Sequence, residues 1–99
     1  MAEHPLQIFA KLDPDLLELV RNTNDLALSD GALPKRFKLL IAMALDASHG
    51  TVQGVKSLAR AAVQAGATQG EITEALRVAQ YISGVGCVYT AAEAFRELF

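Results

Sequence analysis

A polar stretch at residues 48–56, with the sequence SHGTVQGVK, interrupts a chain otherwise rich in residues that favour helices. It contains His49, and Asp46 precedes that histidine by three residues, a spacing that places both side chains on neighbouring faces of a helix. A carboxylate that orients an imidazole ring can make the ring a proton donor or acceptor. His49 also fits a simpler role, in which it stabilises a helix C-terminus through the dipole and the exposed carbonyl groups. His49 and Asp46 are therefore the candidate catalytic pair, with helix capping as the alternative.

Few other residues carry chemistry. One histidine and one aspartate supply too few ligands for a metal unless subunits share a site, so we expect neither a metal nor another cofactor. Cys87, the single cysteine, rules out an intrachain disulfide and is typical of a reducing compartment. With no second thiol or evident base beside it, Cys87 is expected to pack in the core, the alternative being a reactive or ligand-contacting thiol. Tyr81 offers its hydroxyl to a ligand or packs in a core or interface.

Helices separated by glycine and proline must position these residues. Five helices are predicted. The first covers residues 14–27, with an N-cap at Asp13, and the second runs from Pro34 to a left-handed cap at Gly50. The third runs from a cap at Thr51 to Gly66, the fourth from a capping box at residues 68–71 to a break at 84–86, and the fifth covers residues 87–98. No stretch alternates with period two for long enough to form a strand, so the predicted fold class is all-α. Residues 5–10 either add a helical turn that docks on a neighbouring subunit or stay loose.

Length and composition limit the function classes. The 99 residues make a single domain over residues 1–99. Residues 1–12 form the N-terminal segment of this domain that could be loose. Apolar residues make up 52% of the chain, yet no run is long enough to cross a bilayer, so the excess apolar surface is expected in a homo-oligomer interface. The net charge of −2 gives no basic field for nucleic acid or an anionic membrane. Residues 1–4 lack the pattern of a secretion signal, and we expect a cytoplasmic protein.

Several sequence blocks occur in a characteristic order over residues 13–99. They are residues 33–38 (LPKRFK) leading into 40–42 (LIA), 62–68 (AVQAGAT), 71–75 (EITEA), 81–85 (YISGV) and 91–95 (AAEAF). Their order and spacing resemble the carboxymuconolactone decarboxylase family, which includes the alkylhydroperoxidase D proteins. The resemblance implies an alkylhydroperoxidase D-like helical bundle built around a helical hairpin, and assembly as trimers, hexamers or related rings.

The redox branch of that family uses the motif C-x-x-C-x-x-x-H and a glutamate on the preceding helix. Counting back from residues 65–68 places Thr51 and Gly54 at the two cysteine positions, Leu58 at the histidine position and Leu39 at the glutamate position. Thr51 and Gly54 cannot form a thiolate, and Leu58 and Leu39 cannot carry a proton, so dithiol peroxidase chemistry is excluded at these positions. They are expected to line an apolar pocket. Gly54, inside a helix, also indicates the close approach of another backbone or a ligand.

Three functional hypotheses follow. We favour a non-redox, homo-oligomeric family member whose pocket binds a small apolar or amphipathic molecule, with Gln53, Lys56, Tyr81 and Cys87 as possible ligand contacts. The first alternative is a decarboxylase in which His49 moves a proton and Lys56 or Arg60 holds a carboxylate. The second is a peroxiredoxin-like activity through Cys87 and an external thiol. Whether the protein is an enzyme stays open between these hypotheses.

Overall fold

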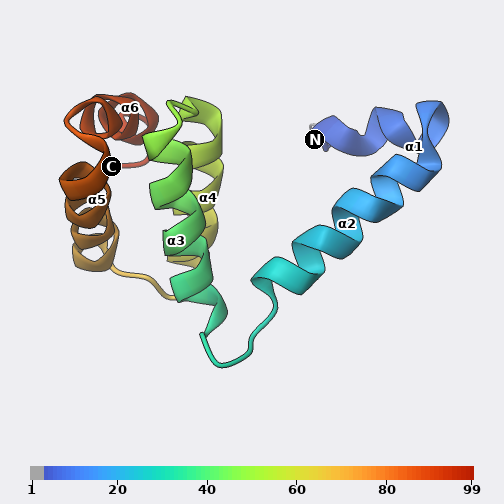
Figure 1. The fold of residues 1–99 in the computed structure, drawn as a ribbon, viewed down its shortest axis with the longest axis horizontal. Coiled ribbons are helices and arrows are strands. Elements are labelled where there is room, and N and C mark those ends of the chain that lie inside the picture. The colour runs from blue at the N-terminus through green and yellow to red at the C-terminus, as the bar shows by residue number, and fades with distance from the viewer. Residues whose placement is uncertain (1–3) are drawn as a thin grey trace.

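A computed structural model describes residues 4–99, and within that range every regular element is helical. Residues 1–3 of the segment expected to be loose lie outside the described residues. The elements are the short 3-10 helix η1 (Pro5–Ile8), α1 (Phe9–Leu12), α2 (Pro14–Leu28), α3 (Lys35–Ser48), α4 (Val52–Gln64), α5 (Gln69–Ser83) and α6 (Gly86–Phe95) (Figure 1). The all-α fold class is therefore confirmed.

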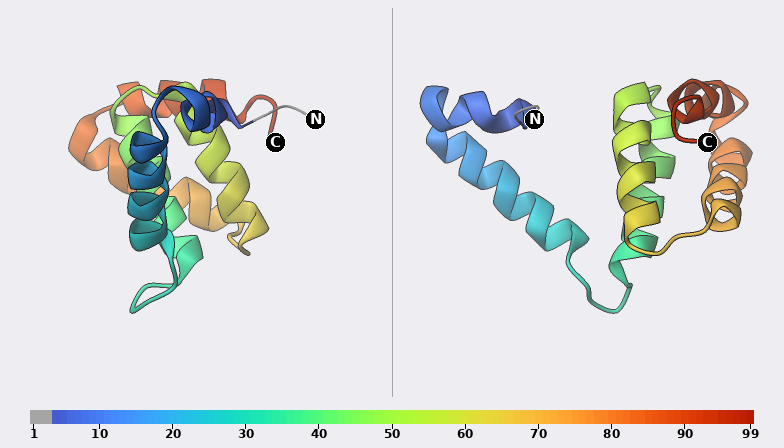
Figure 2. Two further views of the ribbon diagram at one scale, coloured as in Figure 1. Left: turned by 90° about the vertical axis from the view of Figure 1, so that its right-hand side faces the viewer. Right: turned by 180° about the vertical axis from the view of Figure 1, so that it is seen from behind.

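The helices divide into two regions. Helices α3 and α4 run side by side as an antiparallel hairpin, and α5 and α6 pack against it to form what we call the body (Figures 1 and 2). Residues 5–28, comprising η1, α1 and α2, form what we call the arm, which slants away from the body and touches it mainly through α3. The helical hairpin expected from the family resemblance is thus present at the centre of the body. The helical turns expected over residues 5–10 are present in the arm.

The core lies entirely between the body helices. Its buried side chains share a small or medium size, which lets the helices approach closely. The members are Leu39, Leu40, Met43, Ala47, Val55, Ala59, Ala62, Ala67, Ile72, Ala79, Cys87, Ala91 and Ala94. In the arm, by contrast, the buried side chain is Leu17. The arm therefore has no core of its own in which to bury its apolar side chains.

Two glycines end the helices of the hairpin. Gly50 and Gly66 both have positive φ, at 77° and 103°. After α3, the Gly50 N–H donates to the Ala47 carbonyl and the Thr51 N–H donates to the Asp46 carbonyl, which is the bonding pattern of a Schellman motif. The same pattern closes α4 at Gly66. Both glycines were predicted as helix ends, and the first prediction, a left-handed cap at Gly50, is confirmed.

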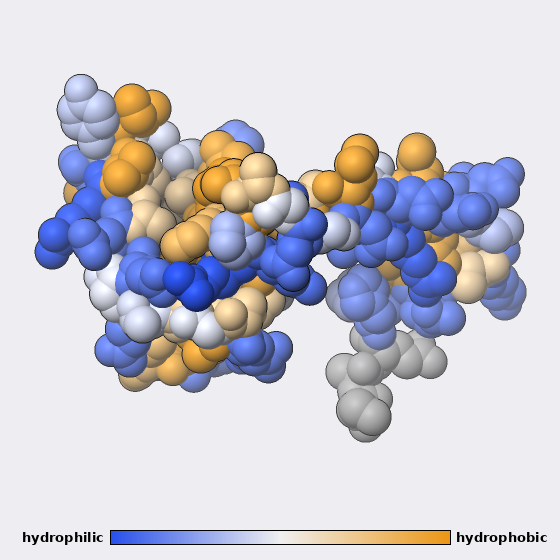
Figure 3. All heavy atoms as spheres, turned by 90° about the horizontal axis from the view of Figure 1, so that it is seen from below, coloured by the Kyte–Doolittle hydropathy of each residue, from blue (hydrophilic) through white to orange (hydrophobic). Residues whose placement is uncertain are grey.

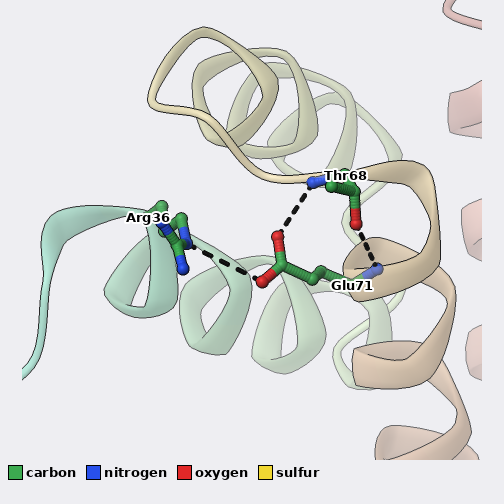
Figure 4. A network of polar contacts seen from close by, with 3 residues as sticks. All are labelled: Arg36, Thr68 and Glu71. Atoms are coloured by element: carbon green, nitrogen blue, oxygen red, sulfur yellow. Dashed lines mark hydrogen bonds and ion pairs between the residues drawn. The ribbon is translucent and has the colours of Figure 1, made fainter.

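The predicted N-caps have mixed outcomes. Asp13 caps α2 by accepting from the Leu16 N–H at 3.0 Å, as expected. The capping box before α5 is also confirmed, because the Thr68 hydroxyl accepts from the Glu71 N–H and the Glu71 carboxylate accepts from the Thr68 N–H (Figure 4). The prediction for Thr51 is wrong: it occupies the N-cap position of α4, but its side chain makes no capping hydrogen bond.

Candidate functional site

His49 is the C-cap residue of α3. Its backbone N–H donates to the carbonyls of Leu45 and Asp46 at 3.0 and 3.2 Å, and its side chain is exposed. Within residues 4–99, no hydrogen bond joins the imidazole ring to the Asp46 carboxylate. The position is the one that the capping alternative requires, and a catalytic role for His49 stays a prediction.

Asp46 faces α4. Its half-buried carboxyl group lies over Gly54, so close that a Cβ added to Gly54 would stand 2.8 Å from the Asp46 Cγ. Gly54 lies in the first turn of α4, where free N–H groups and the helix dipole favour a negative charge. The close approach indicated by Gly54 is therefore real, but its partner is a side chain of the preceding helix and not the backbone or ligand suggested by the sequence.

The four positions matched to the family's redox residues do not converge on one pocket. Leu39 is buried in the core with 2% of its surface exposed, and Thr51 is exposed at the start of α4. Gly54 is covered by Asp46, and Leu58 is half-buried. Of the four, only Leu58 lines either of the two cavities described below. An apolar pocket bounded by Leu39, Thr51, Gly54 and Leu58 together stays a prediction.

An apolar groove runs between α3 and α5. Its volume is about 650 Å³, and most of its walls are aliphatic. The lining residues are Phe37, Leu40, Ile41, Ala44, Leu45, Ser48, His49, Ala75, Val78, Ala79, Ile82 and Ser83. Val78 and Ile82 are 66% and 77% exposed, so the groove is open to solvent along α5.

The polar groups of the groove gather at one end. There the Ser83 hydroxyl donates to the Ser48 hydroxyl at 2.9 Å, and Ser48 in turn donates to the Ala44 carbonyl at 3.0 Å. His49 lines the same end. An aliphatic trough that terminates in two hydroxyls and an imidazole matches a molecule with an apolar body and a polar head.

Most of this groove could not be predicted from the sequence. The sequence indicated the groove only through a second apolar face of α3, where Ile41 and Leu45 lie beside the core stripe. Val78 and Ile82 on α5 gave the same indication. Sequence spacing shows that α3 is apolar on several sides. It does not show which of those sides a neighbouring helix leaves open.

The other expected ligand contacts lie apart from the groove. The Lys56 ammonium pairs with the Glu97 carboxylate, and this hydrogen bond and the positive charge of Lys56 lower the pKa of Glu97. Tyr81 is 82% exposed, and Gln53 is also exposed. Cys87 is 3% exposed and its thiol donates to the Gly84 carbonyl, which fits the expected packing role. None of these four residues lines either cavity.

A second cavity, which we call the arm gap, lies between the arm and the body and has a volume of about 900 Å³. On the arm side it is lined mainly by α2, and on the body side by Ala42 and Leu58. Within residues 4–99, no group of three or more His, Cys, Asp or Glu side chains is arranged to hold a metal ion. None of the helices in the described range combines the length and hydropathy needed to span a bilayer.

Comparisons with known proteins agree with the fold. The model of the carboxymuconolactone decarboxylase family matches residues 14–97. The chain is also similar to apo-lpg0406, a carboxymuconolactone decarboxylase family protein from Legionella pneumophila, whose crystal structure superposes with a TM-score of 0.86. The two sequences are 35% identical over 93% of this chain and 85% of that one. No curated protein matches the chain. From its sequence and its fold alike, the chain belongs to the carboxymuconolactone decarboxylase family.

Proposed function

We propose that this protein is a non-redox member of the family that acts as a cytoplasmic homo-oligomer and binds a small amphipathic molecule in the α3–α5 groove. The single observation that carries the ligand proposal is the groove itself, an apolar trough with Ser48, Ser83 and His49 at one end. The apolar body of the ligand would lie along Ile41 and Val78, and its polar head would meet the hydroxyls. Both serine protons are already donated, so a hydroxyl head could donate to the Ser83 oxygen, and a carboxylate head could accept from an imidazole N–H of His49.

The absence of dithiol chemistry is supported by the side chains themselves. Thr51 and Gly54 cannot supply a thiolate and a resolving thiol, and Leu58 cannot relay a proton. In addition, the space above Gly54 is taken by the Asp46 carboxyl group. A negative charge there would oppose thiolate formation in the first turn of α4.

The homo-oligomer is supported by the surface of the chain. The accessible area is 6944 Å², whereas a compact monomer of this mass exposes about 5,500 Å². The radius of gyration is 14.3 Å, compared with about 12.6 Å for a compact domain of this length. The difference in area, about 1,500 Å², exceeds the roughly 800 Å² that one partner buries in a standard interface.

The decarboxylase alternative needs a base and a cation at one site. His49 lies at the end of the groove, while Lys56 is paired with Glu97, and neither Lys56 nor Arg60 lines either cavity. The Cys87 alternative needs an accessible thiol, whereas Cys87 is buried against Gly84. Both alternatives stay predictions without a specific observation in their favour.

The ligand proposal can be tested with a fluorescent amphipath. We expect anilinonaphthalene sulfonate to bind saturably and to be displaced by decanoate. The substitution Val78→Asp puts a charge in the apolar wall and should weaken binding at least tenfold. Val63→Asp, at a valine that is 46% exposed and lies outside the groove, is the control and should leave binding unchanged. Equal effects of the two variants, or no saturable binding by the wild type, would overturn the proposed site.

Activity assays test the remaining part of the proposal. Hydroperoxide consumption with an external thiol should not exceed background, and turnover that depends on Cys87 would contradict the non-redox assignment. Turnover of a lactone acid that is abolished by His49→Ala would establish the decarboxylase alternative in its place.

A further inference from the structure

The α3–α5 groove has two ends that differ in their electrostatic potential. Helices α3 and α5 run in the same direction, as Figures 1 and 2 show. Near their first residues the Arg36 guanidinium lies 3.7 Å from the Glu71 carboxylate, and at their last residues the Ser83 hydroxyl donates to Ser48. The dipoles of two parallel helices add, so the potential is positive where both helices begin and negative where both end.

The positive end already has an anion of the protein's own. The Glu71 carboxylate lies in the first turn of α5, where it accepts from the Thr68 N–H at 2.9 Å and pairs with Arg36. Figure 3 views the body from this end and shows hydrophilic side chains across it. This end of the groove therefore needs no charge from a ligand.

The negative end has no cation to match. Within the described range, neither α3 nor α5 has a basic residue in its last turn, and Asp46 adds a negative charge to the last turn of α3. No lysine or arginine lines the groove, and His49 is the one lining residue that can carry a charge. With a neutral imidazole at His49, the negative potential at this end is left uncompensated.

The same end presents hydrogen-bond acceptors. Helix α5 stops at Gly84, whose N–H donates to the Gln80 carbonyl at 2.8 Å. In the part of the chain that the structure describes, no backbone N–H donates to the carbonyls of residues 81–83. The Ser83 hydroxyl donates its proton to Ser48 and keeps its oxygen lone pairs for another donor. A ligand head that donates hydrogen bonds therefore finds partners here.

These observations define the head group of the ligand. We propose that the amphipath bound in the α3–α5 groove is a primary alkylamine, with its ammonium group at Ser83 beside the ends of both helices. Its chain lies along Ile41 and Val78. An ammonium supplies three donors and a positive charge, whereas a carboxylate head has only the imidazole of His49 as a donor among the lining side chains. This inference rests on the proposed function, because it takes ligand binding in the groove as given and adds the chemical class of the ligand.

The first experiment compares two probes that share one chain length. Isothermal titration calorimetry with decylamine and with decanoate is carried out at about pH 8, where the amine is protonated and the acid is ionised. Decylamine should bind about tenfold more tightly, because the two helix ends that attract an ammonium repel a carboxylate. Decanoate binding that is equally tight or tighter would overturn the cationic head and leave amphipath binding intact. The absence of saturable binding by either probe would overturn both proposals.

Two lysine variants separate the charge at the groove from the net charge of the protein. Ser83→Lys places an ammonium at the negative end of the groove and should weaken decylamine binding by about tenfold. Gln64→Lys adds the same charge at the exposed last residue of α4, which lines neither cavity, and should leave decylamine binding unchanged. Equal losses in the two variants would show that decylamine responds to net charge alone, and would overturn the placement of its head.

A milder variant tests the same position without adding a charge. Ser83→Ala removes the acceptor oxygen and should weaken decylamine binding by about fivefold, while decanoate binding stays unchanged because a carboxylate gains nothing from that oxygen. Far-UV circular dichroism checks that each variant remains helical. Decylamine binding that is unaffected by both Ser83→Ala and Ser83→Lys would overturn the proposal.

Discussion

Two of the helix junctions in the body, α3–α4 and α4–α5, begin alike and end differently. The turns from α3 to α4 and from α4 to α5 both contain a glycine with positive φ, Gly50 and Gly66, and both place a threonine at the next N-cap. At the second junction, Thr68 and Glu71 satisfy each other's backbone groups, and Glu71 also lies 3.7 Å from the Arg36 guanidinium of α3 (Figure 4). At the first junction, Thr51 makes no such bond.

The difference shows that a helix junction can be closed by local capping hydrogen bonds or by packing between the two helices that it joins. The capping hydrogen bonds of the second junction join residues within one turn of each other, so they could be predicted from the sequence, and the contact of Glu71 with Arg36 is added by the tertiary fold. The first junction instead places Asp46, from the last turns of α3, over Gly54 in the first turn of α4. This is the junction at which the redox branch of the family carries its cysteines, and here it holds a carboxyl group and a glycine.

The largest effect is expected from adding a methyl group at each junction. Gly54→Ala should be less stable than Gly70→Ala by about 2 kcal/mol, because the new Cβ has to displace the Asp46 carboxyl group. Gly70→Ala, in the first turn of α5, meets only an ordinary contact of 3.7 Å and should be neutral or stabilising by up to about 1 kcal/mol. Urea denaturation of both variants measures the difference.

A double-mutant cycle tests whether Asp46 causes the cost of Gly54→Ala. In an Asp46→Ala background, Gly54→Ala should no longer destabilise, since the colliding group is gone. A cost that persists in this background would show that Asp46 is not its cause.

An intermediate effect is expected from removing the left-handed glycines. Gly50→Ala and Gly66→Ala should each cost roughly 1–2 kcal/mol, because an L-residue resists positive φ. Gly86→Ala, at an open helical position in α6, provides the control and should cost nothing. Thermal and urea unfolding measure these values, and equal costs at all three glycines would contradict the assignment.

A smaller effect separates the two threonines. Thr68→Ala should cost about 1 kcal/mol because it removes an N-cap hydrogen bond. Thr51→Ala should cost close to nothing, since its hydroxyl caps nothing. Chemical denaturation compares them, and a similar loss for both would mean that Thr51 caps α4 in solution.

The smallest effect concerns the ion pair between α4 and the C-terminal segment. The folded-state pKa of Glu97 is lowered by Lys56, so this contribution to stability is present above the unfolded-state pKa and is lost as the pH falls through the lower folded-state value. Stability of the wild type and of Glu97→Gln should therefore converge at low pH. Because Glu97 is exposed, the difference near neutrality should be small, and a difference that grows towards acid pH would contradict the assignment.

Much of the fold could be predicted from the sequence because it depends on local chemistry. The glycine ends of α3 and α4, the cap at Asp13 and the capping box at Thr68 each involve residues within a few positions of one another. The fold class followed from these signals and from the absence of strand-like alternation.

The site could be predicted only in part, because it depends on contacts between helices. A carboxylate at position 46 has the spacing to meet His49, yet it packs on Gly54 across the turn. Likewise, the apolar residues Ile41 and Leu45 resemble a core stripe, and only the position of α5 shows that they border an open groove. The separation of the arm from the body could not be predicted either, because a helix with the apolar residues of α2 is expected to pack against the rest of the domain.

The contact between Asp46 and Gly54 also constrains how this chain could change. Any side chain at position 54, including a cysteine, meets the carboxyl group of residue 46. A cysteine introduced at position 54 would therefore have to displace the Asp46 carboxyl group, so sulfur chemistry at positions 51 and 54 also depends on residue 46.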